Sequence, residues 1–572
     1  MRWLAFPRAT LAALALAAAL SLPALSLGLF LDDYIHLASA TGLESPAKGL
    51  ELYRFASGNP SELARFIERG PYPWWTLREL KLNFWRPFSS ALTYVDLALF
   101  GKLEWPPHLH SALWYLALVG ACALVLRRAL PSALGGAALL LFAIDDAHWM
   151  PVSWLANRNA LVAATPALLG LVAHLRWREE RWRFGLPLSM LGYTLGLLAG
   201  EAALGVFCYL AAYEWVAAPG GRRERLGALL PAGLLGLAYV VVYKLGNYGA
   251  FGSGIYIDPS ATPGAFLVAL PPRLLAMVAA QLVAFPADFW LYFEHLRPVQ
   301  VSLGALALVG SGWLLRRAIR GLAEVERRGL TWLLAGAGLS LLPVAATFPT
   351  NRLLLLPSLG GSALLAVLIR HAWRASPFER AWAVVLVLLH VPLAVLGWGS
   401  QYAAFGSAGP RVEKTLVVPL DPSLHVVIPL APDPSVALYA PVVRSYRGAP
   451  QPRSWWTLSL APFDHLLTRT AEDALELEVV GGHMLSTVFE QMVRAPQFPL
   501  REGDQVTLRG FTATVREASS QGPRRLAFRF DRPLDDPSLL FLEWKEGALR
   551  PLELPKVGES RRLARELGPL GF

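Results

Sequence analysis

The stretch LFLDDYIH, from Leu29 to His36, marks the point where an apolar run stops at two adjacent carboxylates. The run behind it, from Thr10 to Leu31, is long enough to cross the hydrocarbon core of a bilayer, which is about 30 Å thick. Carboxylates at the end of a membrane span are unfavourable near lipid. The pair Asp32-Asp33 is therefore either a helix cap in the headgroup region or part of a functional site.

The composition of the whole chain is that of a membrane protein. Of the 572 residues, 54% are hydrophobic and only 16% are charged, whereas soluble domains carry about 25% charged residues. The net charge of +10 comes with arginines that cluster in short loops between apolar runs. Such loops orient membrane segments, so we expect no nucleic-acid partner. The two cysteines lie in apolar runs and indicate neither disulfides nor a metal site.

Apolar runs predict an all-α polytopic membrane domain with about eleven spans. The expected spans are residues 11–31, 109–126, 131–144, 160–175, 184–199, 202–218, 227–245, 300–315, 330–347, 353–369 and 381–399. Arginine-rich loops fall between every second pair of spans, and the intervening loops carry Asp32-Asp33, Asp145-Asp146 and Glu201. This alternation predicts a cytoplasmic N-terminus and an extracytoplasmic C-terminus. The bias towards Ala, Leu, Pro, Gly and Arg suggests a GC-rich bacterial genome, and we therefore expect the chain in a bacterial cytoplasmic (inner) membrane.

Two outer segments and a final domain complete the expected organisation, with residues 1–400 forming the membrane domain. Residues 32–108 form a long outer loop with amphipathic pieces, which predict helices on the membrane surface. Residues 246–298 are apolar but interrupted by Pro271-Pro272, and we expect a re-entrant or surface helix pair rather than one span.

Residues 401–572 change to short runs of alternating polarity separated by turn residues. This pattern predicts a small extracytoplasmic all-β domain, a β-sandwich or barrel. The expected strands are 415–418, 425–428, 475–480, 505–509, 511–516, 525–530 and 539–544.

A second acidic pair, Asp145-Asp146, ends the third predicted span on the same side as Asp32-Asp33. The alternative for this second pair is a solvated loop that turns at Pro151. Two such pairs at the outer ends of odd-numbered spans favour a functional site. Carboxylates there can act as a general base or bind a divalent ion.

Four cations are expected on the same face. Arg86, Arg158, Lys244 and Arg352 could hold a lipid phosphate, for which arginine offers a two-pronged donor. The alternative is that each extends to lipid headgroups, as long basic side chains at helix ends do. We favour that alternative for Lys244 and phosphate binding for Arg352. Further candidates near these groups are His148, Glu201 and His110.

The acidic pair after the first span, the long helical outer loop and the second acidic pair resemble the multi-spanning GT-C glycosyltransferases. A motif series across roughly residues 1–400 is similar to the transmembrane O-mannosyltransferases that carry tetratricopeptide repeats, and to their bacterial relatives. The series contains, in chain order, Phe84-Trp85-Arg86-Pro87, Asp96, Leu99-Phe100-Gly101, His108, His110, Val152-Ser153-Trp154, Arg158-Asn159, Gly200-Glu201-Ala202, Asn351-Arg352-Leu353 and Leu356-Pro357-Ser358-Leu359-Gly360. A usual His-Pro-x-His stretch after the third span is replaced here by residues 144–149, and no repeat array follows.

The resemblance implies a membrane glycosyltransferase, expected to be a hexosyltransferase, that uses a polyprenyl-phosphate sugar donor. Asp32 or Asp33 would be the general base that deprotonates an acceptor at the outer face. The donor phosphate would lie between Arg352 and one or more of Arg86, Arg158 and Lys244. The acceptor, whether glycan, lipid or protein, is left open. No metal or other cofactor is expected to be required, because protein cations can stabilise a monophosphate leaving group. A diphosphate-linked donor would instead make the second acidic pair a metal ligand.

Two alternatives come from other classes. A transporter or lipid flippase would line a path with its intramembrane charges, but no inverted repeat is evident and the acidic residues gather on one face. A catalytically inactive scaffold for the β domain would not need both acidic pairs.

Overall fold

The computed structural model describes residues 4–43 and 46–571, and the chain divides into two compact units. Unit 1 comprises Met1–Leu27, Trp85–Tyr248 and Ile257–Ala404; unit 2 comprises Gly28–Phe84, Gly249–Tyr256 and Phe405–Phe572. The division differs from a single boundary at residue 400. Residues 28–84 group with the C-terminal part because their side chains pack against it. For example, the buried Trp74 donates through Nε1 to the carbonyl of Leu458 at 2.9 Å.

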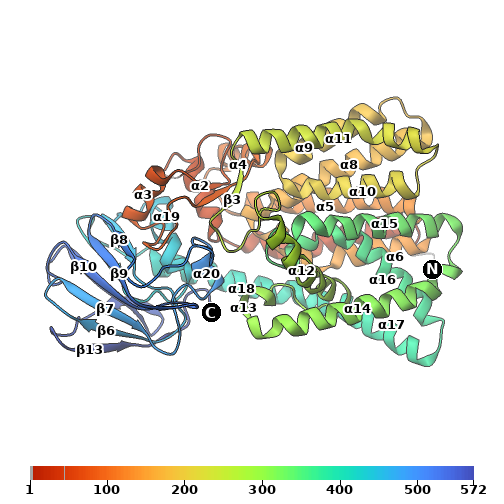
Figure 1. Cartoon of the computed structure of the whole chain (residues 1–572). Coiled ribbons are helices and arrows are strands. Elements are labelled where there is room, and N and C mark those ends of the chain that lie inside the picture. The colour runs from red at the N-terminus through yellow and green to blue at the C-terminus, as the bar shows by residue number, and fades with distance from the viewer. Residues whose placement is uncertain (1–3, 44–45, 572) are drawn as a thin grey trace. The chain divides into compact units, whose positions relative to one another are not determined.

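Unit 1 is helical throughout (Figure 1). Its helices are α1 (Arg8–Ser21), η2 (Leu22–Ser26), α4 (Pro87–Phe100), α5 (Trp105–Ala129), α6 (Ala133–Ile144), η3 (Asp146–His148), α7 (Trp149–Ser153), η4 (Leu155–Asn157), α8 (Asn159–Glu180), α9 (Gly185–Ala199), η5 (Glu201–Ala203), α10 (Leu204–Val216), α11 (Arg222–Leu245), α12 (Pro263–Val283), α13 (Phe289–Tyr292), η6 (Glu294–Leu296), α14 (Arg297–Ala318), η7 (Ile319–Gly321), α15 (Glu324–Val344), η8 (Asn351–Leu354), α16 (Pro357–Trp373), α17 (Pro377–His390) and α18 (Pro392–Leu416), which continues into unit 2.

The chain is a multi-pass membrane protein. Seven of the described helical segments are long and apolar enough to cross a bilayer: Arg8–Ser26, Trp105–Ala129, Leu155–Glu180, Arg222–Leu245, Pro263–Val283, Glu294–Gly321 and Pro377–Leu416. Two shorter apolar helices, Ala133–Ile144 and Gly185–Ala199, accompany them. The count of about eleven spans stays a prediction.

Two local predictions are wrong. The segment expected to break at Pro271-Pro272 is one continuous helix, α12, of 21 residues. Proline is tolerated within such a helix where neighbouring helices surround it, and α12 packs along α14. No strand forms at 415–418: residues 415–416 end α18 and residues 417–418 follow it as loop. Ala408, Val412 and Leu416 lie four residues apart and are all buried. Their helical spacing outweighs the short β-like run.

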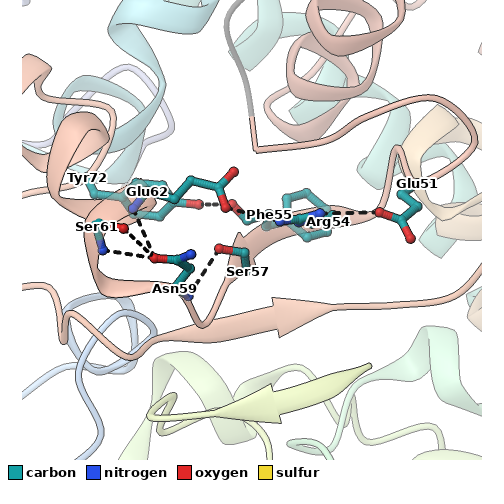
Figure 2. Close-up of polar contacts among 8 residues, drawn as sticks. All are labelled: Glu51, Arg54, Phe55, Ser57, Asn59, Ser61, Glu62 and Tyr72. Carbon is teal, nitrogen blue, oxygen red and sulfur yellow. Dashed lines mark hydrogen bonds and ion pairs between the residues drawn. The ribbon is translucent and has the colours of Figure 1, made fainter. Parts of the chain in front are cut away.

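The N-terminal part of unit 2 surrounds a small antiparallel sheet. Its strands β1 (Arg54–Ser57), β2 (Lys81–Asn83) and β3 (Gly249–Phe251) lie in that order, beside α2 (Asp32–Ala40) and α3 (Pro60–Arg69). The side chain of Asn59 caps α3 by accepting from the backbone N–H groups of Ser61 and Glu62, as Figure 2 shows. Gly70 ends α3 at φ 101°, and a Cβ there would lie 1.8 Å from the carbonyl oxygen of Trp455. Only glycine allows this close approach.

The C-terminal part of unit 2 contains two sheets. Strands β4 (His425–Ile428), β5 (Ser454–Thr457), β6 (His465–Arg469), β7 (Ala474–Val479), β8 (Gln505–Thr507), β9 (Phe511–Ser519), β10 (Gly522–Phe530), β11 (Leu539–Lys545), β12 (Ala548–Pro551) and β13 (Ser560–Leu563) form a six-stranded sheet, ordered β13-β6-β7-β10-β9-β8, and a four-stranded sheet, ordered β12-β11-β4-β5. The six-stranded sheet is antiparallel, whereas β4 pairs in parallel with both β5 and β11.

Aromatic side chains join the two sheets, as in a sandwich. Trp456 of one sheet lies 5.3 Å from Phe511 of the other between ring centroids, and Phe530 lies 5.9 Å from Phe541. The predicted strands at 425–428, 475–480, 505–509, 511–516, 525–530 and 539–544 are confirmed within one to a few residues. The domain also holds helical turns that the strand pattern did not predict: a π-helical turn (Ser435–Tyr439), α19 (Ala440–Tyr446) and α20 (Val488–Gln491).

Candidate functional site

The first acidic pair lies at a strained turn in unit 2. Helix α2 begins at Asp32, and the residue before it, Leu31, has φ 43° and ψ −102°. A non-glycine residue in such a conformation costs about 1–3 kcal/mol and is typical of functional sites. The Asp33 carboxylate stabilises the turn, because its Oδ2 accepts the backbone N–H of Phe30 at 2.9 Å. Asp33 is 2% exposed, whereas Asp32 is only partly buried.

Asp32 is held by a residue from the C-terminal part of the same unit. The phenol of Tyr439 donates to Asp32 Oδ1 at 2.6 Å. Burial, followed by the charge of Asp32, raises the pKa of Tyr439 well above its ordinary value. The phenol therefore stays protonated and remains a hydrogen-bond donor to the carboxylate.

A second phenol and an ion pair lie near Asp32. Burial raises the pKa of Tyr72, and the charges of Asp32 and Glu62 raise it further. Figure 2 shows this neighbourhood: Tyr72 donates to the carbonyl of Phe55 at 2.5 Å, and Arg54 binds Glu62 at 3.0 Å. Because Arg54 neutralises Glu62, the extra negative charge of Glu62 beside the acidic pair is compensated.

The second acidic pair lies in unit 1, after α6. Asp145 accepts the backbone N–H of Ala147 at 3.0 Å and so begins η3. Burial, with a smaller contribution from the neighbouring Asp145 charge, raises the pKa of Asp146 to about 7. A Cβ added to Gly397 would lie 2.7 Å from Asp146 Oδ2, so α18 packs tightly over this carboxylate.

His148 connects three helical segments in this region through hydrogen bonds. It is fully buried, its Nε2 lies 2.9 Å from Ser358 Oγ, and its Nδ1 lies 3.1 Å from Tyr115 Oη. These bonds join η3 to α5 and α16, and both ring nitrogens are occupied by protein partners.

The sequence interpretation missed Asp288, which organises the turn that carries Arg352. Asp288 accepts the Thr350 hydroxyl and, through Oδ2, the backbone N–H of Asn351 at 3.1 Å. The side chain of Asn351 in return accepts the backbone N–H of Ala287 at 2.8 Å. Asp288 follows an apolar run in a segment expected on the outer side, the same signal that identified the acidic pairs.

Three of the four predicted phosphate-binding cations have acidic partners. Arg86 Nε binds Glu201 Oε2 at 2.9 Å, and Glu201 Oε1 also accepts the hydroxyl of Tyr243 at 3.0 Å. The deeply buried Arg158 binds Asp96 Oδ2 at 2.6 Å.

Lys244, the third of these cations, and the candidate His110 also have acidic partners. His110 Nδ1 lies 2.8 Å from Asp96 Oδ1, so Asp96 joins the histidine to Arg158. Lys244, which is exposed, binds Asp258 Oδ2 at 3.2 Å.

Arg352 differs from the other three cations. It lies in η8, partly exposed, with its guanidinium carbon 5.6 Å from the centre of the Trp154 ring. Across residues 4–43 and 46–571, no acidic side chain forms an ion pair with it. A guanidinium that contacts an indole face keeps N–H donors that can bind an anion.

Unit 1 brings the second acidic pair and Arg352 together. The turn η3, which begins at Asp146, packs against η8. Asp288 lies near enough to raise the pKa of Asp146 through its charge. Asp32 and Asp33 belong instead to unit 2, with Tyr439 and Tyr72. Within the described ranges, no group of three or more His, Cys, Asp or Glu side chains is arranged to hold a metal ion, so metal independence stays a prediction.

No family model and no curated protein sequence matches this chain. Among solved structures, the chain is similar to the Archaeoglobus fulgidus oligosaccharyltransferase tethered to an acceptor peptide, with 15% identity and a TM-score of 0.38 over 77% of this chain. The similarity spans 64% of that protein, less than two thirds of its length. It is also similar to ArnT from Cupriavidus metallidurans bound to undecaprenyl phosphate, with 16% identity and a TM-score of 0.37, over 77% of this chain and 84% of ArnT. TM-scores below 0.5 do not establish a common fold, and the resemblance to O-mannosyltransferases stays a prediction.

Proposed function

We propose that this protein is a membrane glycosyltransferase that moves a sugar, expected to be a hexose, from a polyprenyl-phosphate donor to an acceptor. The reaction would take place at the outer face of a bacterial cytoplasmic membrane, with the N-terminus inside and the C-terminal domain outside. The motif series across residues 1–400 supports the reaction class. The alternation of arginine-rich loops supports the orientation.

The observation that carries the proposal is the strained turn at Leu31. A conformation that costs free energy presents Asp32 at the start of α2, while Asp33 is buried and bonded to the backbone of Phe30. We therefore assign Asp32 as the general base and Asp33 as the residue that holds the turn. Asp32 would accept the proton of the acceptor hydroxyl or amine as that group attacks the anomeric carbon.

Arg352 would bind the donor phosphate. The guanidinium would stabilise the negative charge that develops on the phosphate as the sugar–phosphate bond breaks. The apolar start of α16, which follows η8, would lie along the polyprenyl chain. Arg86, Arg158 and Lys244 bind carboxylates, so we propose that they shape the site rather than hold the phosphate alone.

The test uses purified protein in proteoliposomes with a panel of undecaprenyl-phosphate-linked radiolabelled hexoses and a cell-envelope extract as the acceptor source. Transfer is measured as label that leaves the donor lipid. We expect Asp32→Asn to lower turnover at least a hundredfold, the order typical of losing a general base. Asp33→Asn should lower it less, because an amide oxygen can still accept the Phe30 N–H. Near-normal transfer by Asp32→Asn would refute the assignment.

A further inference from the structure

A phenol in the C-terminal part of unit 2 donates a hydrogen bond to the proposed general base. Tyr439 lies 407 positions after Asp32 in the chain, and its hydroxyl donates to Asp32 Oδ1 at 2.6 Å. Both residues belong to unit 2, and α19, which starts directly after Tyr439, packs against α2. Tyr439 is 9% exposed, so the hydrogen bond is largely shielded from water.

The backbone that carries Tyr439 is specifically anchored. Tyr439 ends the π-helical turn Ser435–Tyr439, and such turns are rare and frequent at functional sites. Asp433, 2% exposed, accepts the Ser435 backbone N–H at 2.9 Å and the Leu570 N–H at 2.7 Å. The indole of Trp455 on β5 donates to the carbonyl of Val436 at 2.9 Å.

These hydrogen bonds join the turn that carries Tyr439 to two segments that lie later in the sequence. The turn is fixed to β5 through Trp455 and to the C-terminal residues through Asp433. Because the backbone of Tyr439 is held in place, its hydroxyl can fix the orientation of the carboxylate to which it donates.

The hydrogen bond has two chemical consequences for Asp32. A donor to a carboxylate stabilises the charged form and so lowers its pKa. It also engages Oδ1 and so restricts rotation of the Asp32 carboxylate.

We propose that Tyr439 is a positioning residue for Asp32, so that the C-terminal part of unit 2 sets the orientation of the proposed general base. The inference rests on the proposed function, in which Asp32 is the base. Tyr439 itself touches no substrate in this proposal; it acts through the carboxylate.

The first experiment compares Tyr439→Phe with wild type in pH profiles of transfer. Loss of the donated hydrogen bond should raise the pKa of Asp32, so the acidic limb should move to higher pH by about one unit or more. Affinity for the donor lipid should be unchanged. Tyr446→Phe, which removes another buried phenol hydroxyl from the same domain, is the matched control and should leave the limb in place.

A second variant guards against a folding defect. Fluorotyrosine incorporated at position 439 keeps the hydroxyl but makes it a stronger donor, so the acidic limb should move to lower pH. The infrared band of the protonated Asp32 carboxyl group is identified by its absence in Asp32→Asn. Its pH titration measures the same two shifts in the pKa of Asp32 without requiring turnover.

The outcomes separate the inference from the proposed function. If Asp32→Asn abolishes transfer but both position-439 variants titrate like wild type, Tyr439 is only a contact between segments and the inference fails. If Asp32→Asn transfers normally, the proposed base is wrong. Opposite shifts in the phenylalanine and fluorotyrosine proteins would support Tyr439 as the positioning residue.

Discussion

Replacing Arg352 tests the phosphate site directly, because this side chain has a geometry that the other three cations lack. It carries no ion pair across the described part of the chain and lies 5.6 Å from the Trp154 ring, in a turn fixed by Asp288 and Asn351. Removing the guanidinium should therefore remove a ligand contact without leaving a buried carboxylate unpaired.

The magnitude follows from the hydrogen bond that would be lost. A hydrogen bond to a charged group contributes about 1.5–3 kcal/mol, so Arg352→Ala should weaken binding of an undecaprenyl-phosphate donor roughly tenfold to a hundredfold. Arg352→Lys keeps the charge but loses the two-pronged donor, and its affinity should fall between those of wild type and Arg352→Ala. The loss of stacking on Trp154 should change the unfolding free energy by only about 0.5–1 kcal/mol.

The assay is equilibrium binding of a fluorescent undecaprenyl phosphate to the purified protein in nanodiscs, with thermal unfolding measured in parallel. Arg183→Ala is the matched control, because Arg183 also lies over an aromatic ring, 4.5 Å from the centre of Phe184, but in a loop expected on the opposite face. Equal affinity of wild type, Arg352→Lys and Arg352→Ala would reduce Arg352 to a membrane anchor. An equal loss in Arg183→Ala would show that general charge, rather than this site, attracts the lipid.

Two further predictions concern the second acidic pair. Because burial and the neighbouring Asp145 charge raise the pKa of Asp146 to about 7, folded protein keeps a proton there that unfolded chain loses near pH 4. The free energy of unfolding should therefore fall as pH rises from about 4 to 7, and this contribution should level off above pH 7. Thermal unfolding measured between pH 5 and 8 should show a smaller fall in Asp146→Asn than in wild type. Parallel curves for the two proteins would contradict the raised pKa of Asp146. Transfer should also persist in excess EDTA, since a monophosphate leaving group can be stabilised by Arg352 alone; activity lost to the chelator and restored by Mg²⁺ or Mn²⁺ would instead make Asp145 and Asp146 metal ligands.

The sequence alone identified a membrane protein with a C-terminal β domain, and it located the charged groups at the ends of the apolar runs. Helices and strands follow from patterns within about twenty residues, so six of the seven predicted strands of the C-terminal domain are confirmed, although β5, β6, β12 and β13 were not predicted. The acidic pairs were identifiable for the same reason, because each interrupts an apolar run at its end. Asp288 carried the same local signal, but it lay in a segment interpreted as a broken helix pair.

The tertiary structure decided which charged groups pair and which segments share a unit. Arg86 and Glu201 are 115 positions apart, and Asp32 and Tyr439 are 407 positions apart. No local pattern encodes such pairs, since they depend on how distant helices and strands pack. The continuity of α12 and the extension of α18 were likewise set by neighbouring helices and buried contacts, which outweigh the preference of a single residue or a short run.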